Sequence, residues 1–252
     1  MLLNLIVHYV NLLIVSKPTT HRERMLRMNN PATDNTQAAP TQTAPAQETP
    51  AQAATTQAAP TQKTSASKKK QITVLVGSLR GGSFARKIAT QAIELLPEDC
   101  TGTIVEIGHL PLYNFDYDDP EVPDVQTPHS YTEFRETIKD SDGILFVTSE
   151  NNRTIPACLK NAIDIGSKPN SDVAWKHLPA GIISHSVGRM GGYSSQKNLR
   201  LALSYFEMPT PGQPEVFLGQ SPSLLDDAGA FNNDKTRDFV ADYLRRFAEL
   251  MR

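Results

Sequence analysis

Five short apolar runs alternate with segments of helical spacing between residues 71 and 252, and this alternation limits the possible folds more than any other feature. The runs are rich in β-branched side chains, which is typical of strands buried on both faces. The segments between them are too long for hairpins, so the strands must pair in parallel through right-handed crossovers. The pattern predicts an α/β domain with a doubly wound, five-stranded parallel sheet in three layers.

The expected elements follow from the two periodicities. Strands are predicted over residues 72–76, 103–107, 143–148, 181–184 and 215–218. Helices are predicted over residues 84–96, 131–139, 156–164, 194–206 and 235–251. Pro156 is expected at the first helical position, where its missing N–H needs no acceptor. The apolar side of the last helix is expected to hold Phe239, Leu244, Phe247 and Leu250.

The first seventy residues differ in character from the rest. Residues 29–67 contain no Val, Ile, Leu or aromatic side chain, and QAAPTQ occurs twice in them. Such a stretch cannot bury enough apolar surface to offset chain ordering, so residues 1–70 are predicted to be a disordered tail rich in Ala, Thr, Gln and Pro. Residues 1–15 form an apolar run that is short for a membrane span and lacks the flanks of a secretory signal. Either this run associates with a membrane, or translation begins at Met25 or Met28 and the run is never made.

Charge divides the chain in the same way. Residues 1–70 carry eight basic and three acidic side chains, whereas residues 71–252 carry 17 and 24, a net charge of −7. An acidic domain is a poor match for a nucleic-acid backbone, so no nucleic-acid partner is expected. The two cysteines, Cys100 and Cys158, have neither the number for a disulfide framework nor metal-ligand spacing. No metal site is predicted.

The loop after the first predicted strand, residues 77–83, leads directly into a helix. Ligands of doubly wound sheets bind beyond the carboxyl ends of the strands, and a helix amino end favours phosphate. Arg80 adds a cation that can contact phosphate oxygens in bidentate fashion. The alternative is a plain turn in which Ser83 caps the helix. A serine-hydrolase elbow at Ser83 is disfavoured, because six residues separate it from Val76.

Two further loops are expected at the same edge of the sheet. Residues 149–164 begin with a run of polar side chains after a buried strand, which suits recognition of a heterocycle. Residues 184–192 contain three glycines, which let the backbone approach a flat ligand closely. His185 by itself is interpreted as a hydrogen-bonded loop residue and not as a catalyst.

Together the three loops make residues 71–252 resemble the NAD(P)H-dependent FMN reductase family, which includes flavodoxin-like quinone, azo-dye and chromate reductases. The family pattern G-S-L-R-x-x-S-x-N is matched from Gly77 to Ser83, and P-E-Y-N-x-S-I-P-G-x-L-K-N-A-I-D is matched at Glu150, Asn152, Ile155, Pro156 and residues 159–164. The chain departs from these patterns at Ala85, Ser149, Asn151 and Ala157, where the family usually has Asn, Pro, Tyr and Gly. The loss of the aromatic side chain at 151 is expected to alter flavin affinity or potential.

The resemblance implies a flavodoxin-like fold and a non-covalently bound FMN that takes hydride from NADPH or NADH and passes electrons to a small acceptor in ping-pong fashion. It implies no dedicated catalytic acid, base or nucleophile, because the flavin supplies the chemistry. The acceptor would be a quinone, an azo compound, a metal oxyanion or free flavin. The implied cofactor-binding residues are Ser78, Arg80, Ser83, Phe84, Ala85, Ser149, Glu150, Asn151, Asn152, Arg153, Ser186, Gly188, Arg189 and Gly191.

Members of this family form dimers or tetramers, so a homodimer or homotetramer is expected. The segment 108–130, with Tyr113, Phe115 and Tyr117, is either part of the interface or an ordered surface loop. The folded domain is expected in the cytoplasm without a membrane partner. Two alternatives stay open at this point. The domain is either an FMN-binding electron carrier that does not oxidise NAD(P)H or a degenerate interaction module that binds no flavin.

Overall fold

The computed structural model describes residues 68–251. The predictions for the apolar run 1–15 and the tail through residue 67 lie outside the described residues, and the division of the chain near residue 70 stays a prediction. The first strand begins at Lys70, directly after Lys68 and Lys69.

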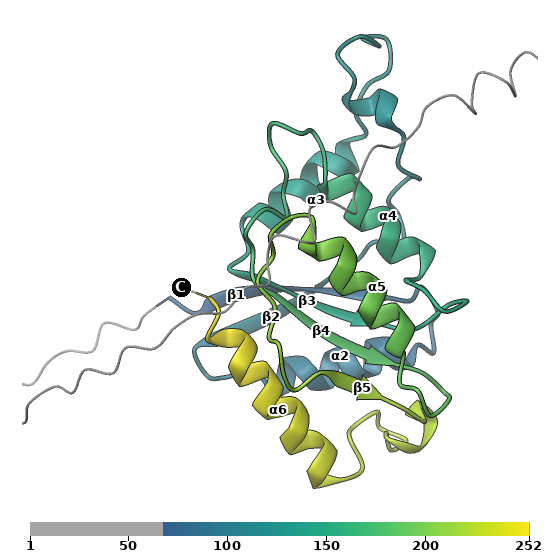
Figure 1. The fold of residues 1–252 in the computed structure, drawn as a ribbon, viewed down its shortest axis with the longest axis vertical. Coiled ribbons are helices and arrows are strands. Elements are labelled where there is room, and N and C mark those ends of the chain that lie inside the picture. Colours follow the sequence, from purple (N-terminus) through teal and green to yellow (C-terminus); the bar gives the residue numbers. More distant parts are fainter. Residues whose placement is uncertain (1–67, 252) are drawn as a thin grey trace, which may run out of the picture. The chain divides into compact units, whose positions relative to one another are not determined.

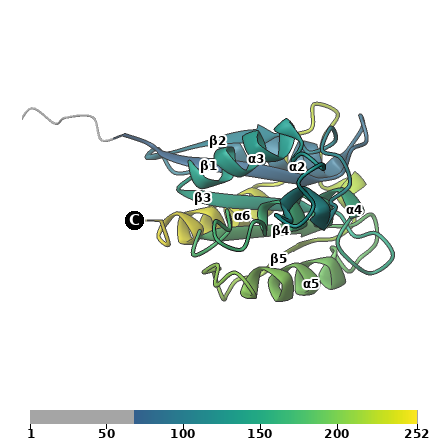
Figure 2. The ribbon, with the colours of Figure 1, turned by 90° about the horizontal axis from the view of Figure 1, so that it is seen from above.

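One parallel sheet forms the centre of the domain. Its strands are β1 (Lys70–Gly77), β2 (Cys100–Val105), β3 (Gly143–Thr148), β4 (Ala180–His185) and β5 (Val216–Leu218). All neighbours pair in parallel in the order β2-β1-β3-β4-β5, which Figure 2 shows from above. This strand order is that of the flavodoxin-like doubly wound sheet. The predicted five-stranded parallel sheet is confirmed.

Helices cover both faces of the sheet (Figure 1). They are α2 (Phe84–Glu94), α3 (His129–Lys139), α4 (Ala157–Gly166), α5 (Tyr193–Ser204) and α6 (Asp234–Ala248). Because strand side chains alternate, Val74 and Val76 pack in one core with α2 and α6, whereas Leu75 packs in a second core with α3, α4 and α5. The three predicted layers are therefore confirmed.

The helix after β3 begins one residue later than predicted. Pro156 has φ −55° and ψ 141° and lies at the N-cap of α4, outside the helical region. The extended ψ angle places proline before the first turn, where its missing N–H likewise costs no hydrogen bond.

The boundaries of β2 and the core face of α6 also differ from prediction. β2 starts at Cys100, which pairs with Lys70 of β1, and not at residue 103. A Cβ atom at Gly102 would lie 2.9 Å from the Ile93 side chain of α2, so a larger residue there would require that side chain to shift. In α6 the buried face holds Val240, Tyr243, Leu244 and Phe247, whereas Phe239 is 37% exposed. The helical period of 3.6 residues aligns residue 240, and not 239, with 244 and 247.

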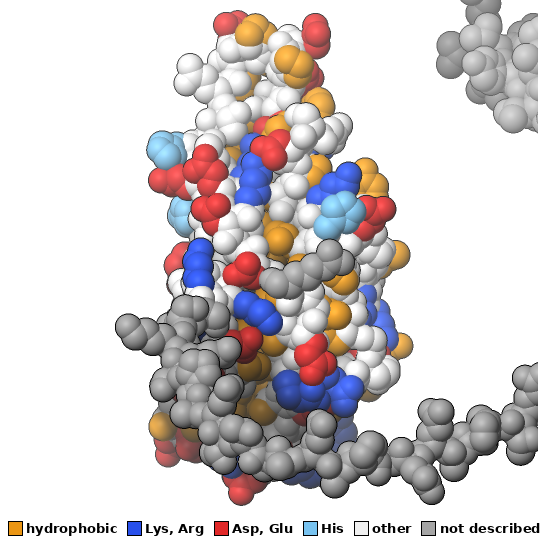
Figure 3. All heavy atoms as spheres, turned by 90° about the vertical axis from the view of Figure 1, so that its left-hand side faces the viewer, with side chains coloured by type: hydrophobic (Ala, Val, Ile, Leu, Met, Phe, Trp, Pro, Cys, Tyr) orange, Lys and Arg blue, Asp and Glu red, His pale blue; other side chains and the backbone are white. Residues whose placement is uncertain are grey.

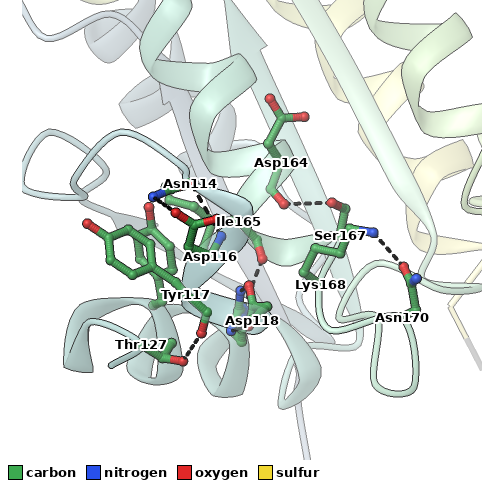
Figure 4. A network of polar contacts seen from close by, with 12 residues as sticks. Asn114, Asp116, Tyr117, Asp118, Thr127, Asp164, Ile165, Ser167, Lys168 and Asn170 are labelled. Atoms are coloured by element: carbon green, nitrogen blue, oxygen red, sulfur yellow. Dashed lines mark hydrogen bonds and ion pairs between the residues drawn. The ribbon is translucent and has the colours of Figure 1, made fainter. Parts of the chain in front are cut away.

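The segment between β2 and α3 is held at its base by a buried ion pair. It contains a short 3₁₀ helix, η1 (Phe115–Asp118). The Asp118 carboxylate accepts two hydrogen bonds from the Arg135 guanidinium, at 2.9 and 2.6 Å, and Arg135 Nε donates to the Ile165 carbonyl at 2.9 Å. Figure 4 shows Asp118 close to Ile165 at this point. The rings of Tyr113 and Tyr117 pack on Tyr131, at centroid distances of 6.3 and 5.6 Å.

The surface mixes charges of both signs. On the face drawn in Figure 3, acidic and basic side chains are interspersed, with apolar patches between them. Within residues 68–251 no helix combines the length and apolar character that crossing a bilayer requires.

Candidate functional site

A cavity of about 430 Å³ opens at the carboxyl ends of β1, β3 and β4. This is the edge at which doubly wound sheets bind ligands, and the volume lies in the range of small-molecule sites. Part of the predicted set lines it, namely Ser78, Arg80, Ser83, Phe84, Ser149, Glu150, Asn151 and Ser186. The three loops that the sequence placed at one edge therefore meet at one cavity.

The first loop presents hydrogen-bond donors to this cavity. Ser83 is the N-cap of α2, and its Oγ accepts from the Arg86 N–H at 3.2 Å. The N–H groups of Phe84 and Ala85 in the same turn have no intrahelical acceptor, as at any helix amino end. The capping interpretation of Ser83 is correct, yet it leaves the Ser83 hydroxyl hydrogen free to donate. Capping and anion binding are thus compatible in this turn.

Two arginines near the first loop have different roles. Arg86 forms a bidentate ion pair with Glu106, with Nη2 at 2.7 and 2.6 Å from the two carboxylate oxygens. Arg80 is exposed at the cavity rim, and within residues 68–251 it takes part in no ion pair. The charge of Arg80 therefore remains available to an anionic ligand.

The second loop is fastened to its neighbours by the predicted residues themselves. Ser149 Oγ donates to the Gly77 carbonyl at 2.9 Å, which joins the ends of β3 and β1. The Glu150 carboxylate accepts from the backbone N–H groups of Ser194 and Ser195, at 2.9 and 3.2 Å, and so caps α5. Ser149 and Glu150 line the cavity and also hold its walls in place.

Asn152 and Arg153 form the tip of a tight turn instead of lining the cavity. Asn151 and Thr154 exchange backbone hydrogen bonds at 3.1 and 3.0 Å, and the two residues between them have φ angles of 50° and 62°. Two successive positive φ angles are the geometry of a type I′ turn. Asn152 instead borders a neighbouring depression, together with Thr154 and Lys160.

The third loop reaches the cavity through Ser186 and then folds toward β5. Gly188 accepts from the Gln220 N–H at 2.8 Å, and the Gly191 carbonyl accepts from Ser184 Oγ at 2.8 Å. Gly191 has φ +61°, and a Cβ atom there would lie 2.6 Å from the Phe217 carbonyl carbon, so glycine is required. Gly188, Arg189 and Gly191 do not line the cavity. Ala85 is fully buried among core side chains, so only its backbone can reach a ligand.

Several lining residues were not singled out as cofactor-binding residues from the sequence. They are Gly77, Leu79, Pro156, Ala157, Cys158, His185 and Val187. Leu79 and Val187 are 59% and 68% exposed, which makes an apolar rim. Burial raises the pKa of the Cys158 thiol, so it stays protonated at neutral pH. Gly77 and Leu79 stand within the matched first pattern, and Pro156, Ala157 and Cys158 stand within the second, whereas no pattern marked His185 or Val187.

The chemistry of the cavity fits a phosphorylated flavin. A helix amino end, two serine hydroxyls and one free arginine are the donors that a phosphate requires. His185 also lines the cavity, and its ring nitrogen Nε2 is buried and has no hydrogen-bond partner among residues 68–251. Within residues 68–251, no group of three or more His, Cys, Asp or Glu side chains is arranged to hold a metal.

Fold and site together define a flavodoxin-like α/β protein whose first loop offers the hydrogen-bond donors and the charge that suit a phosphate. Residues 71–223 match the family model described as NADPH-dependent FMN reductase. Over 182 residues the chain is 44% identical to a quinone reductase of Pseudomonas putida and 36% identical to a 2-hydroxy-1,4-benzoquinone reductase of a Burkholderia species. These alignments cover 72% of this chain and 95% and 96% of the two relatives.

A solved structure supports the same assignment. The flavoenzyme FerB of Paracoccus denitrificans, an NAD(P)H:(acceptor) oxidoreductase, superimposes with a TM-score of 0.65 and 29% identity, over 72% of this chain and 96% of FerB. The chain belongs to the NADPH-dependent FMN reductase family. It is an oxidoreductase that uses FMN and NAD(P)H, and the prediction of family, enzyme class and cofactors is confirmed.

Proposed function

We propose that this enzyme reduces quinones in the cavity between the first, second and third loops. The observation that carries the proposal is the meeting of these loops beside the amino end of α2, with a free arginine at the rim. When bound in this cavity, FMN would supply the redox chemistry between the nicotinamide and the acceptor. The identity of 44% to a quinone reductase supports a quinone as the acceptor.

The chain's own residues hold and orient the cofactor. Ser78, Arg80, Ser83 and the N–H groups of Phe84 and Ala85 bind the phosphate. Ser149, Glu150, Asn151 and Ser186 line the cavity and would hold the ring system there. Five other predicted residues do not contact the cofactor and instead form the turns that shape the second and third loops. They are Asn152, Arg153, Gly188, Arg189 and Gly191. The apolar rim of Leu79 and Val187 suits a flat, uncharged acceptor such as a quinone.

A second part of the proposal is self-association. The rings of Tyr113 and Tyr117 pack on Tyr131 within the protomer, so these two residues are poor interface candidates. Leu112 and Phe115 on the same segment are 81% and 49% exposed, and exposed apolar side chains favour association. We expect a homodimer or homotetramer whose interface contains these two residues.

A cytoplasmic location is part of the same proposal, because both Cys100 and Cys158 are free thiols.

The first test is spectroscopic and kinetic. The purified chain should carry the absorption band of oxidised flavin and should oxidise NADPH or NADH with benzoquinone as acceptor. Flavin binding without nicotinamide oxidation would identify an electron carrier instead, and a colourless protein that FMN does not stabilise would leave only an interaction module.

A matched pair of variants tests the phosphate site. Arg80→Ala should weaken FMN binding about tenfold, because a charge-assisted contact to the phosphate is lost. Riboflavin, which lacks the phosphate, should bind this variant as it binds the original protein. Arg86→Ala removes a nearby arginine that is already paired with Glu106, so it should leave FMN affinity unchanged. Equal losses of FMN affinity in the two variants would mean that Arg80 contributes only to the net positive charge near the cavity and does not contact the phosphate.

A further inference from the structure

His185 ends β4 with its side chain buried, at 5% exposure, in the wall of the cavity. Its Nδ1 lies 2.8 Å from Ser221 Oγ, in the short 3₁₀ helix η2 (Ser221–Ser223). Ser221 Oγ in turn donates to the Ser186 carbonyl at 2.7 Å. A hydroxyl has one hydrogen, so Ser221 can only accept from His185, and Nδ1 must carry the ring proton.

This assignment makes Nε2 the lone-pair nitrogen of the ring. The atom is buried, and among residues 68–251 it has no hydrogen-bond partner. A buried acceptor without a donor is costly, so such groups occur where a ligand or water completes the hydrogen bond. Burial lowers the pKa of His185 to about 4, and the imidazole is therefore neutral near pH 7.

The side of the sheet on which the imidazole lies indicates which part of FMN the imidazole contacts. Side chains alternate along a strand, so His185 lies on the same side of the sheet as Ile183. Ile183 packs in the core that contains Ala85 and Ile88 of α2. The ring is therefore on the side of the helix whose amino end is assigned to the phosphate. A lone pair repels phosphate oxygens but accepts from hydroxyl groups, and those of the ribityl chain adjoin the phosphate.

We propose that His185 is a cofactor-binding residue whose Nε2 accepts a hydrogen bond from a hydroxyl group of the ribityl chain of FMN. The inference rests on the proposed placement of FMN in this cavity. It gives His185 a role that the sequence did not indicate. It also gives Ser221, which is outside the cavity lining, a positioning role, because the hydroxyl holds the tautomer that leaves Nε2 free to accept.

The test compares three flavins on the full chain by fluorescence titration. His185→Asn retains an amide that can donate to Ser221 but has no acceptor at the Nε2 position. We expect this variant to bind FMN and riboflavin about five- to tenfold more weakly, since one hydrogen bond is lost. Lumiflavin has the ring system but no ribityl chain, so its affinity should not change. His185→Gln, whose amide oxygen can reach the Nε2 position, should recover part of the loss.

Two outcomes of the titration decide against the inference. Unchanged FMN affinity in His185→Asn, or an equal loss for lumiflavin, overturns the ribityl contact while the proposed function stands. If the original protein binds no flavin, the proposed function falls as well. If neither variant folds by circular dichroism, ¹⁵N NMR of the original protein decides. The Nε2 chemical shift should change when FMN or riboflavin binds and should not change with lumiflavin. An Nε2 chemical shift that none of the three flavins changes overturns the inference.

Discussion

At the scale of single residues, Arg135 and Asp118 form the most buried ion pair of the described chain, with side-chain exposures of 8% and 4%. Removing one partner leaves the other charge buried without compensation. Arg135→Met should therefore lower the free energy of unfolding by about 3–5 kcal/mol in urea denaturation. The double variant with Asp118→Leu removes both charges and should recover most of this loss. A double variant as unstable as Arg135→Met would show that packing, and not the uncompensated carboxylate, causes the loss.

The burial of His185 leads to a second prediction for a single residue: the free energy of unfolding depends on pH. Its pKa is lowered by burial from 6.5 to about 4. As the pH falls below about 6.5, the unfolded chain binds a proton at this residue and the folded chain does not, so the free energy of unfolding decreases. The decrease amounts to about 3 kcal/mol by pH 4 and then levels off.

The measurement is urea denaturation of the flavin-free protein between pH 7 and pH 4. His185→Asn has no titrating ring, so the difference between its curve and that of the original protein isolates the effect of His185. The other titrating groups contribute equally to the pH dependence of stability in both proteins. Parallel curves over this range would contradict a buried, neutral imidazole.

At the scale of elements, the turn at residues 151–154 stores backbone strain. Arg153 has φ 62°, a left-handed conformation that favours glycine. Arg153→Gly should raise the free energy of unfolding by about 1 kcal/mol relative to Arg153→Ala, measured by urea denaturation. Both variants lose the side chain, so their difference reports the backbone alone. Equal stabilities would mean that the turn relaxes out of this conformation when the arginine is removed.

The elements themselves were largely predictable, because the patterns that specify them are local. β3 (Gly143–Thr148) has the predicted bounds, since residues 144–147 form an unbroken apolar run and the chain on either side of the strand is polar. β2 was placed too late, because Thr101 and Gly102 do not look like a buried strand. Gly102 packs closely against the Ile93 side chain of α2, and no local pattern contains that contact.

At the scale of the whole molecule, the lining of the cavity that residues 68–251 provide runs from Gly77 to Val187. Residues 29–67 also lack the apolar side chains that a packed domain requires. Deleting residues 1–67 should therefore leave FMN affinity and kcat/KM for benzoquinone unchanged within about twofold. Titration and steady-state kinetics of the full and shortened chains make the comparison. A loss of tenfold or more would assign the tail a part in binding or assembly.

The sequence by itself determined the α/β class, the parallel sheet and the family, because periodicity and loop patterns lie within short stretches of chain. It also indicated that the loops after β1, β3 and β4 share one edge, since parallel strands end on the same side. Tertiary structure alone decided what each loop residue does. Glu150 caps α5, Gly191 packs on β5, and His185 lines the cavity with a buried ring nitrogen that has no partner among the described residues. These roles depend on atoms that meet across distant elements, and no stretch of sequence records which atoms will meet.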